Sequence, residues 1–469
     1  MKTAKRPALL SLLLTLAVTV WAGTPKYIFY FIGDGMGMGP VMAAQTYKRM
    51  VQNNEQLLMT TFPTASWVQT YSASSPVTDS AAAGTALATG HKTKNGMLGM
   101  DADTVAVEAI SVKLQRMGYG IGIVTSGAAD DATPGAFYTH VPNRGMYYEI
   151  GKDAAYCGFD FIAGSGLRGT KKKDGTPNDL YDVLEQSGVQ ILRGAKGAAE
   201  STASSSKRIM LLNPEGYSDP NEFGFHVDAV GADGVGLTLE IALDACIKHL
   251  EKNSPDKFFV MCEGSLIDHA LHGNDGAGAI GEVMDLDRCI GMAYDFYLKH
   301  KDETLIIVTA DHDTGGMSVG CAYTGYNAIP KYFDYAKISK NALSGYCENL
   351  LKNDTAITWD EMKNLLSEKL GLWTEIKVKD ADTKALEQAF NESFIERKDV
   401  AEKGLYSTCM GFASKVFKVY NNCSGWGFTT GNHTGNPVPV FAVGAGAERF
   451  NHVLNNIEIA PAIMEAVGE

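Results

Sequence analysis

Residues 258–272 read FFVMCEGSLIDHALH, and the fold prediction starts from this stretch. Residues 258–262 are an uninterrupted apolar run with the length of a buried β-strand. Polar side chains follow at once, first Glu263 and then Asp268 and His272 in a segment that reads as a short helix. Because open α/β sheets bind ligands beyond the carboxyl ends of their strands, this order predicts a functional site there.

The same alternation of apolar runs and helical patterns continues along the chain. Further strand-like runs lie at 27–32, 121–125, 305–309 and 438–443, and helical patterns lie at 105–117, 237–250 and 282–298. Such alternation predicts an α/β fold with a mostly parallel central sheet flanked by helices on both faces. A stretch at 165–220 with a Lys-rich and a Ser-rich segment breaks the pattern and predicts a solvated excursion.

Two more of these strands end in candidate metal ligands. Gly33-Asp34-Gly35 follows the run at 27–32, and Asp311-His312 follows the run at 305–309. Each group alone is weak, because an Asp in a Gly-rich loop is usually a turn residue. Three such groups on one chain favour a metal site. Asp268 and His272 are four residues apart and would share one helix face; mixed Asp/His ligation suits Zn²⁺, whereas an all-oxygen set suits Mg²⁺.

Residues 76–90, PVTDSAAAGTALATG, supply a candidate nucleophile. They predict a helix of small residues that begins near Ser80. A helix N-terminus presents free N–H groups and a positive dipole end, which favour an anion and a deprotonated hydroxyl. Taken alone, Asp79 or Ser80 is more simply a helix cap. Beside the candidate metal ligands, Ser80 becomes the candidate nucleophile.

Taken together, these motifs resemble the alkaline phosphatase family. The resemblance runs from about residue 26 to about residue 447 and is carried, in the family's order, by the 33–36 loop, Asp79-Ser80-Ala81 with Gly84, Asp131-Ala132-Thr133-Pro134, Asn143-Arg144, Glu263-Gly264 with Asp268 and His272, Thr309-Ala310-Asp311-His312, and His433-Thr434-Gly435. It implies an alkaline phosphatase-like fold and hydrolysis of phosphate monoesters to an alcohol and inorganic phosphate, through a phosphoserine intermediate.

The resemblance also implies a centre of two Zn²⁺ ions and one Mg²⁺ ion. Its metal-contacting positions match Asp34, Ser80, Thr133, Glu263, Asp268, His272, Asp311, His312 and His433. Asp268, His272 and His433 would hold the first zinc. Asp34, Asp311 and His312 would hold the second, and Asp34 would bridge to a magnesium held also by Thr133 and Glu263.

The remaining matches concern the substrate phosphate. Ser80 matches the nucleophile, and Arg144 matches the side chain that binds two phosphate oxygens. In the family, the positions of Asp131 and His269 vary and tune the third metal site and the water around the phosphate. This chain has a mixed Asp131/His269 pair, which leaves the identity of the third metal open.

The N-terminus predicts export. Lys2, Lys5 and Arg6 precede an apolar run at 8–20 and a small-residue cleavage site near Ala22, the pattern of a signal peptide at 1–22. That run is too short to span a bilayer. We therefore expect a periplasmic or secreted protein without a membrane span, and one catalytic domain over residues 23–469.

Residues 317–428 match no family motif and predict an insertion with its own helices, one of which begins at Thr358 and stops near Gly371. The insertion is either a cap at the active-site rim or a stabilising surface excursion. Because exported proteins can form disulfides, one or two are expected among Cys321, Cys347, Cys409 and Cys423. We expect Cys246, Cys262 and Cys289 to be buried hydrophobes, by contrast.

Composition limits the partners. With 54 acidic and 41 basic residues the net charge is −13, which argues against broad nucleic-acid binding and leaves small phosphorylated substrates as the expected partners. A homodimer stays open. Three other functions stay possible from the sequence. A sulfatase needs Cys or Ser in a C/S-x-P-x-R context, whereas Ser80 precedes three alanines, and a phosphodiesterase usually lacks an equivalent of Arg144. A non-catalytic phosphate- or metal-binding protein needs no intact nucleophile.

Overall fold

The computed structural model describes residues 23–217, 222–229, 231, 233–405 and 408–469. Within them, ten strands form one sheet in the order β16-β2-β15-β8-β1-β7-β3-β4-β6-β5. Their bounds in chain order are β1 Tyr27–Gly33, β2 Thr64–Gln69, β3 Gly120–Thr125, β4 Phe161–Gly164, β5 Gln190–Arg193, β6 Ile209–Leu212, β7 Phe258–Gly264, β8 Thr304–Ala310, β15 Val438–Gly444 and β16 Leu454–Asn455. The sheet is parallel except for β15, which runs antiparallel to both β8 and β2. The predicted mostly parallel sheet is confirmed.

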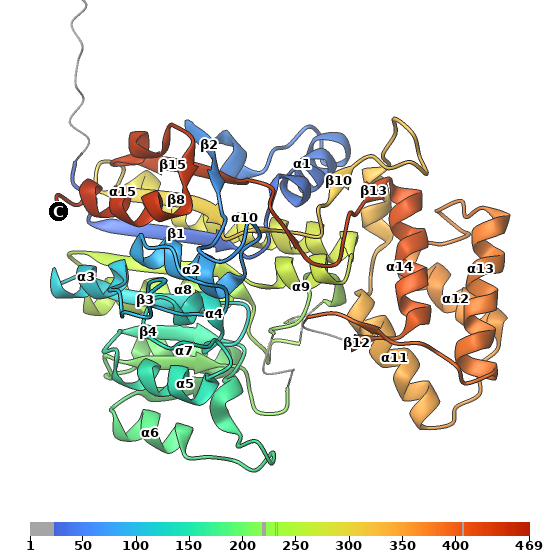
Figure 1. Cartoon of the computed structure of the whole chain (residues 1–469), viewed down its shortest axis with the longest axis horizontal. Coiled ribbons are helices and arrows are strands. Elements are labelled where there is room, and N and C mark those ends of the chain that lie inside the picture. Colours follow the sequence, from blue (N-terminus) through green and yellow to red (C-terminus); the bar gives the residue numbers. More distant parts are fainter. Residues whose placement is uncertain (1–22, 218–221, 230, 232, 406–407) are drawn as a thin grey trace, which may run out of the picture.

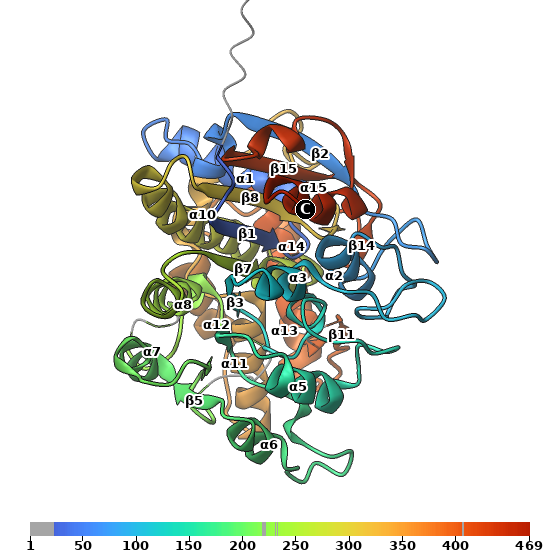
Figure 2. The same ribbon diagram turned by 90° about the vertical axis from the view of Figure 1, so that its left-hand side faces the viewer.

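The five predicted strands are all present as β1, β3, β7, β8 and β15. Every residue of β1, β7 and β8 is buried, because helices cover both sides of the sheet. Figure 2 shows the sheet edge-on, with α1 (Met38–Val51), α8 (Leu239–Asn253) and α10 (Gly276–Lys299) on one face and α2 (Ser80–Thr89), α3 (Ile110–Arg116) and α15 (Ile459–Ala466) on the other. The predicted helix at 105–117 begins later than expected, because Ala106 pairs with Met100 in an isolated bridge.

The prediction for residues 165–220 is wrong in part. This stretch contains α6 (Leu180–Gln186) and α7 (Gly194–Ala203) as well as β5 and β6 of the main sheet. The apolar residues of β6 are fully buried between β4 and β5. The polar composition of the flanking loops concealed a strand of only four residues.

Residues 317–428 form a helical unit at one end of the sheet, drawn in orange at the right of Figure 1. It contains α11 (Lys340–Lys352), α12 (Trp359–Leu370), α13 (Asp380–Phe390) and α14 (Gly411–Ser424), which pack around an apolar core of their own. As predicted, α12 starts after Thr358 with a complete capping box and ends at Gly371, whose φ of 70° is left-handed. The strands β10 (Ser318–Val319) and β13 (Trp426–Gly427) pair where the chain leaves and returns.

The expected disulfides are absent from the described residues, where all eight cysteines are free thiols. Cys347 and Cys423 instead pack in the apolar core of the insertion, and the Cys409 thiol donates to Asn341 Oδ1 at 3.3 Å. Cys246, Cys262 and Cys289 are buried, as predicted. In the described part of the chain no helix has the length and apolar character needed to cross a membrane. The predicted signal peptide at 1–22 lies outside the described residues.

Candidate active site and metal centre

Three central strands bring their carboxyl ends to one point. In the parallel register, Gly33 of β1 pairs with Gly264 of β7 on one side and with Ala310 of β8 on the other. The residues that follow each strand therefore emerge side by side. This register places Asp34 and Asp311 beside the turn into α9 (Leu266–His272), and it explains how groups almost 280 residues apart come together.

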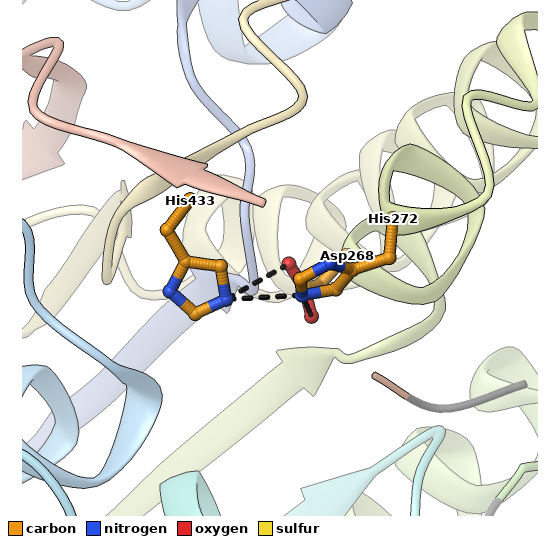
Figure 3. A group of neighbouring side chains, drawn as sticks. All are labelled: Asp268, His272 and His433. Atoms are coloured by element: carbon orange, nitrogen blue, oxygen red, sulfur yellow. Dashed lines mark hydrogen bonds and ion pairs between the residues drawn. The ribbon is translucent and has the colours of Figure 1, made fainter. Parts of the chain in front are cut away.

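The first cluster of ligands contains Asp268, His272 and His433 (Figure 3). Asp268 and His272 lie one turn apart on α9, and His433 comes from the short strand β14 (His433–Thr434). His272 Nε2 lies 3.3 Å from Asp268 Oδ2, and His433 Nε2 lies 3.9 Å from Asp268 Oδ1. The three candidate ligand atoms converge within 4.8 Å of one another.

The two imidazoles of this cluster are oriented for a cation. His272 Nδ1 lies 2.7 Å from the Gly431 carbonyl oxygen and His433 Nδ1 lies 2.9 Å from that of Thr78. A carbonyl oxygen only accepts, so each Nδ1 carries a hydrogen and Nε2 of each ring faces inward. Burial alone would lower the pKa of His272, but the Asp268 carboxylate raises it. In its neutral form each ring turns the lone pair of Nε2 inward, and this is the form that binds a metal. The two Nε2 atoms face each other at 3.0 Å. A metal ion that accepts both lone pairs fits this arrangement better than two neutral rings alone.

The second cluster contains Asp34, Asp311 and His312. His312 Nε2 lies 3.3 Å from Asp34 Oδ1 and 3.2 Å from Asp311 Oδ2. Those two carboxylate oxygens, and Asp268 Oδ2 in the first cluster, are buried and have no hydrogen-bond partner among the described residues. Buried carboxylates without a partner are costly. The donor set therefore fits a bound cation.

Electrostatics lead to the same interpretation. Burial, with a further contribution from nearby Asp268, raises the pKa of Asp311 to about 7, and burial raises the pKa of Glu263 to about 8. Burial first, and then the carboxylate of Asp311, raise the pKa of Asp34 well above its usual range. Burial, together with neighbouring His433, lowers the pKa of His312 far below its usual range. A metal ion binds neutral imidazole and ionised carboxylate. A divalent ion that binds here would therefore displace protons from the crowded carboxyl groups.

Ser80 is the first residue of α2, and its side chain is buried beside the second cluster. Its Oγ lies 3.2 Å from His312 Nε2. Asp79 caps the helix by accepting a hydrogen bond from the Ala82 backbone N–H at 3.0 Å. Asp79 is therefore the helix cap, and Ser80, the candidate nucleophile, faces the ligands.

Arg144 lies at the mouth of the same site and is held by two carboxylates. Its Nη2 is 3.1 Å from Asp131 Oδ1 and its Nη1 is 3.6 Å from Asp79 Oδ2. The side chain stays 18% exposed, so it is partly accessible to solvent. A planar guanidinium oriented in this way is suited to two oxygens of a phosphate.

The candidate third site lies at the end of β7. Glu263 accepts a hydrogen bond from the Thr125 hydroxyl; burial raises the pKa of Glu263, and the side chains of Thr125 and Thr133 offset only part of that rise. Thr133 is buried on α4 (Ala132–Gly135), which Asp131 caps. His269 is also buried, and its Nδ1 lies 3.1 Å from Glu222 Oε2.

Three residues at this site were not predicted from the sequence. Arg168 Nη1 bonds Asp131 Oδ2 at 2.9 Å, so two arginines share one carboxylate. Glu222 contacts His269, and Thr314 of β9 (Asp313–Thr314) contacts ligands of both clusters. Arg168 lies in the stretch 165–220, for which the sequence predicts an excursion, and Glu222 lies just after it. Thr314 follows Asp311-His312 by two residues, and that proximity was the one available signal.

Comparison with known proteins identifies the family. Residues 25–468 match the family model for alkaline phosphatase. Alkaline phosphatase 4 of Bacillus subtilis is 28% identical over 94% of this chain and 88% of its own, and the repressible alkaline phosphatase of Saccharomyces cerevisiae is 26% identical over 92% and 78%.

Solved structures agree with the sequence comparison. The cold-active alkaline phosphatase of a psychrophilic Shewanella superposes with a TM-score of 0.78 at 26% identity, covering 94% of this chain and 100% of its own. A mutant of the TAB5 alkaline phosphatase, solved with Mg bound in its M3 site, gives a TM-score of 0.65 at 25% identity, covering 95% and 99%. Metal cofactors are thus implied. The chain belongs to the alkaline phosphatase family, whose fold and activity are those of phosphate-monoester hydrolases.

Proposed function

We propose that the enzyme hydrolyses phosphate monoesters in two steps, with Ser80 as the nucleophile and a phosphoserine intermediate. The observation that carries this proposal is the position of Ser80 Oγ, which lies 3.2 Å from His312 Nε2 at the N-terminus of α2. In the first step a bond forms between Ser80 Oγ and phosphorus while the bond to the leaving alcohol breaks. In the second step water displaces Ser80 and releases inorganic phosphate.

We assign the two clusters to Zn²⁺ and the oxygen-only set of Asp34, Thr133 and Glu263 to Mg²⁺, because mixed Asp/His ligation suits zinc and oxygen ligands suit magnesium. When bound, such ions lower the pKa of a hydroxyl and offset the charge on the attacking and leaving oxygens. The mixed Asp131/His269 pair lies beside this third site, so metal analysis of the purified enzyme is the test of the Mg²⁺ assignment.

The protein's own groups position the substrate. The N-terminus of α2 directs backbone N–H groups and its positive dipole end toward an anion at Ser80. Arg144 would bind two phosphate oxygens bidentately, while Asp79 and Asp131 fix its orientation. A terminal monoester offers one more free oxygen than a diester. Binding of two phosphate oxygens by Arg144 therefore favours monoesters over diesters.

We infer three further properties from the sequence. Residues 1–22 would direct export to the periplasm or the medium, and residues 23–469 would form one catalytic domain. The insertion at 317–428 would wall the rim of the site, since candidate ligands lie near both of its ends: His312 precedes it and His433 follows it. A homodimer stays a hypothesis for which sedimentation is the direct measurement.

The test compares a chromogenic phosphate monoester with the matching diester and sulfate ester at alkaline pH. The proposal predicts that the zinc- and magnesium-supplied enzyme prefers the monoester, that a chelator abolishes turnover, and that Ser80→Ala retains almost no activity. A preference for the sulfate ester or the diester would establish a sulfatase or a phosphodiesterase instead. Tight phosphate binding without turnover would establish a binding protein.

A further inference from the structure

Thr314 is the residue that contacts ligands of both clusters through one atom. Its side chain is fully buried at the start of the segment that follows β8. Its hydroxyl hydrogen-bonds Asp268 Oδ1 of the first cluster and lies 3.1 Å from His312 Nδ1 of the second. One hydroxyl therefore bridges a carboxylate and an imidazole that face different candidate metals.

The chemistry of the three groups fixes the direction of both hydrogen bonds. The Thr314 hydroxyl donates to Asp268 Oδ1, because a carboxylate oxygen accepts hydrogen bonds. The single hydroxyl hydrogen of Thr314 must then point to Asp268. His312 Nδ1 must therefore donate its hydrogen to Thr314 Oγ1, which leaves the lone pair on His312 Nε2.

That lone pair faces the second cluster. His312 Nε2 lies within 3.3 Å of both Asp34 Oδ1 and Asp311 Oδ2 and 3.2 Å from Ser80 Oγ. An imidazole ligates a metal through the nitrogen that carries no hydrogen, and the bond made by the other nitrogen selects which one that is. The Thr314 hydroxyl thus selects the ligating tautomer.

The backbone of Thr314 is held as firmly as its side chain. Its N–H donates to the Gly35 carbonyl oxygen at 3.1 Å, and the residue pairs with His433 in the β14–β9 ladder. Gly35 has a φ of 68°, and a Cβ there would come within 2.8 Å of Thr314 Oγ1 and 2.7 Å of Asp268 Oδ1. The glycine therefore makes room for this hydroxyl and allows the Asp34 loop to pack directly on it.

We propose that Thr314 is a positioning residue that couples the two metal sites. Its hydroxyl orients Asp268 for the first metal and sets the His312 tautomer for the second, so that the loss of one oxygen atom weakens both sites together. This inference rests on the proposed metal centre. It goes beyond that centre by assigning a role to a residue that contacts neither the metals nor the substrate.

The test measures zinc rather than turnover. Thr314→Val keeps the shape and removes the hydroxyl, Thr314→Ser keeps the hydroxyl, and Thr309→Val is the matched control. Thr309 is also fully buried at the same edge of the sheet, but its hydroxyl donates to the Pro439 carbonyl oxygen at 2.8 Å and touches no ligand. Zinc affinity is measured by competition with a chelator, and bound metal is counted by elemental analysis.

We expect Thr314→Val to weaken zinc binding at both sites by about 10- to 100-fold, the range for groups that orient metal ligands. Thr314→Ser and Thr309→Val should stay within about threefold of the wild type. In the cobalt-substituted protein, the visible absorption of Thr314→Val should change at both sites. Circular dichroism of the chelated proteins checks folding, and Thr314→Ala replaces the valine variant if that variant is unfolded.

The failures are distinguishable. A wild-type protein that binds no zinc overturns the proposed function and this inference with it. If the wild type binds two zinc ions and the folded Thr314→Val protein binds both equally well, the metal centre stands and the role of Thr314 is refuted. A loss confined to one site, or a serine variant as weak as the valine variant, also refutes the coupling.

Discussion

The carboxyl edge of the sheet and the inserted helical unit at 317–428 differ in the charge of the polar groups that they bury. In the insertion, a capping box closes α12, and Thr358 and Glu361 satisfy one another's backbone groups. At the sheet edge, carboxylate oxygens of Asp34, Asp268 and Asp311 are buried without a hydrogen-bond partner among the described residues. In the insertion, the buried atoms without a partner are neutral ones such as Asn421 Oδ1 and Trp426 Nε1, whereas at the sheet edge they are carboxylate oxygens, which a bound cation would neutralise. Substitutions should therefore cost activity in one region and stability in the other.

The largest effect is expected from Asp311→Asn. Asp311 Oδ1 accepts backbone N–H groups from Gly35 and His312, at 3.0 and 2.8 Å, and an Asn oxygen can keep both bonds. The substitution removes the negative charge and replaces Oδ2, the oxygen that faces His312, with an amide nitrogen. We expect kcat/KM to fall by about 10⁴-fold, as for loss of an essential catalytic group, while the metal-free protein at pH 9 unfolds at the same or a higher temperature. Lower stability with retained activity would reverse the comparison.

Arg144 should have the next largest effect. Arg144→Ala should lower kcat/KM by about 10²- to 10³-fold, the range for one group that stabilises transition-state charge. Arg144→Lys should recover less than tenfold, because an ammonium cannot bind two oxygens in the plane of a guanidinium. Steady-state kinetics and the inhibition constant for inorganic phosphate measure both. Full recovery by lysine would show that charge alone suffices there.

The pH dependence of stability should separate the metal-free and metal-loaded proteins. Burial raises the pKa of Asp311 to about 7 and that of Glu263 to about 8, so the native state binds protons that the unfolded state has already lost. The stability of the metal-free protein should therefore fall as the pH rises from about 4 to about 8. Calorimetry with and without zinc should show a difference in Tm that widens over this range. A constant difference would contradict the interpretation of the carboxyl cluster.

The smallest effect belongs to the insertion. Thr358→Ala removes the cap of α12 and should lower the free energy of unfolding by about 1 kcal/mol. Thr358→Ser keeps the hydroxyl and should be nearly neutral. Neither should change kcat/KM or zinc content, because α12 packs within the separate core of the insertion. Urea unfolding followed by two probes measures the change, and a loss of zinc in the alanine variant would join the two regions that the comparison separates.

The ligands that follow strands of the sheet could be predicted from local sequence patterns, and the ligand that does not could not. Asp34, Asp311 and His312 were predicted because each directly follows a buried strand, and parallel register makes such positions converge. His433 follows no such strand. It reaches the site through a two-residue pairing of β14 with β9, and only the family resemblance indicated it. A local sequence pattern indicates where a strand ends. It does not indicate which distant segment of the chain, such as β14, pairs beside that end.

Other residues escaped the sequence for a different reason. Thr314 and Arg168 act through groups that are common throughout the chain, so nothing in their type marks them. Their roles arise from what they touch, which are two ligands for Thr314 and the shared carboxylate of Asp131 for Arg168. The four cysteines of the insertion gave a wrong prediction of disulfides. Two of them, Cys347 and Cys423, are instead buried as apolar side chains in the core of the insertion.

The central claim is that Ser80 becomes phosphorylated during turnover. The most direct measurement is rapid acid quenching of the zinc- and magnesium-loaded enzyme with a phosphate monoester, followed by peptide mass spectrometry. The account predicts one phosphorylated peptide, with the phosphoryl group on Ser80, that is absent from chelated enzyme and from Ser80→Ala. A fully active enzyme in which Ser80 never carries phosphate, or an Ser80→Ala variant that turns over normally, would contradict it.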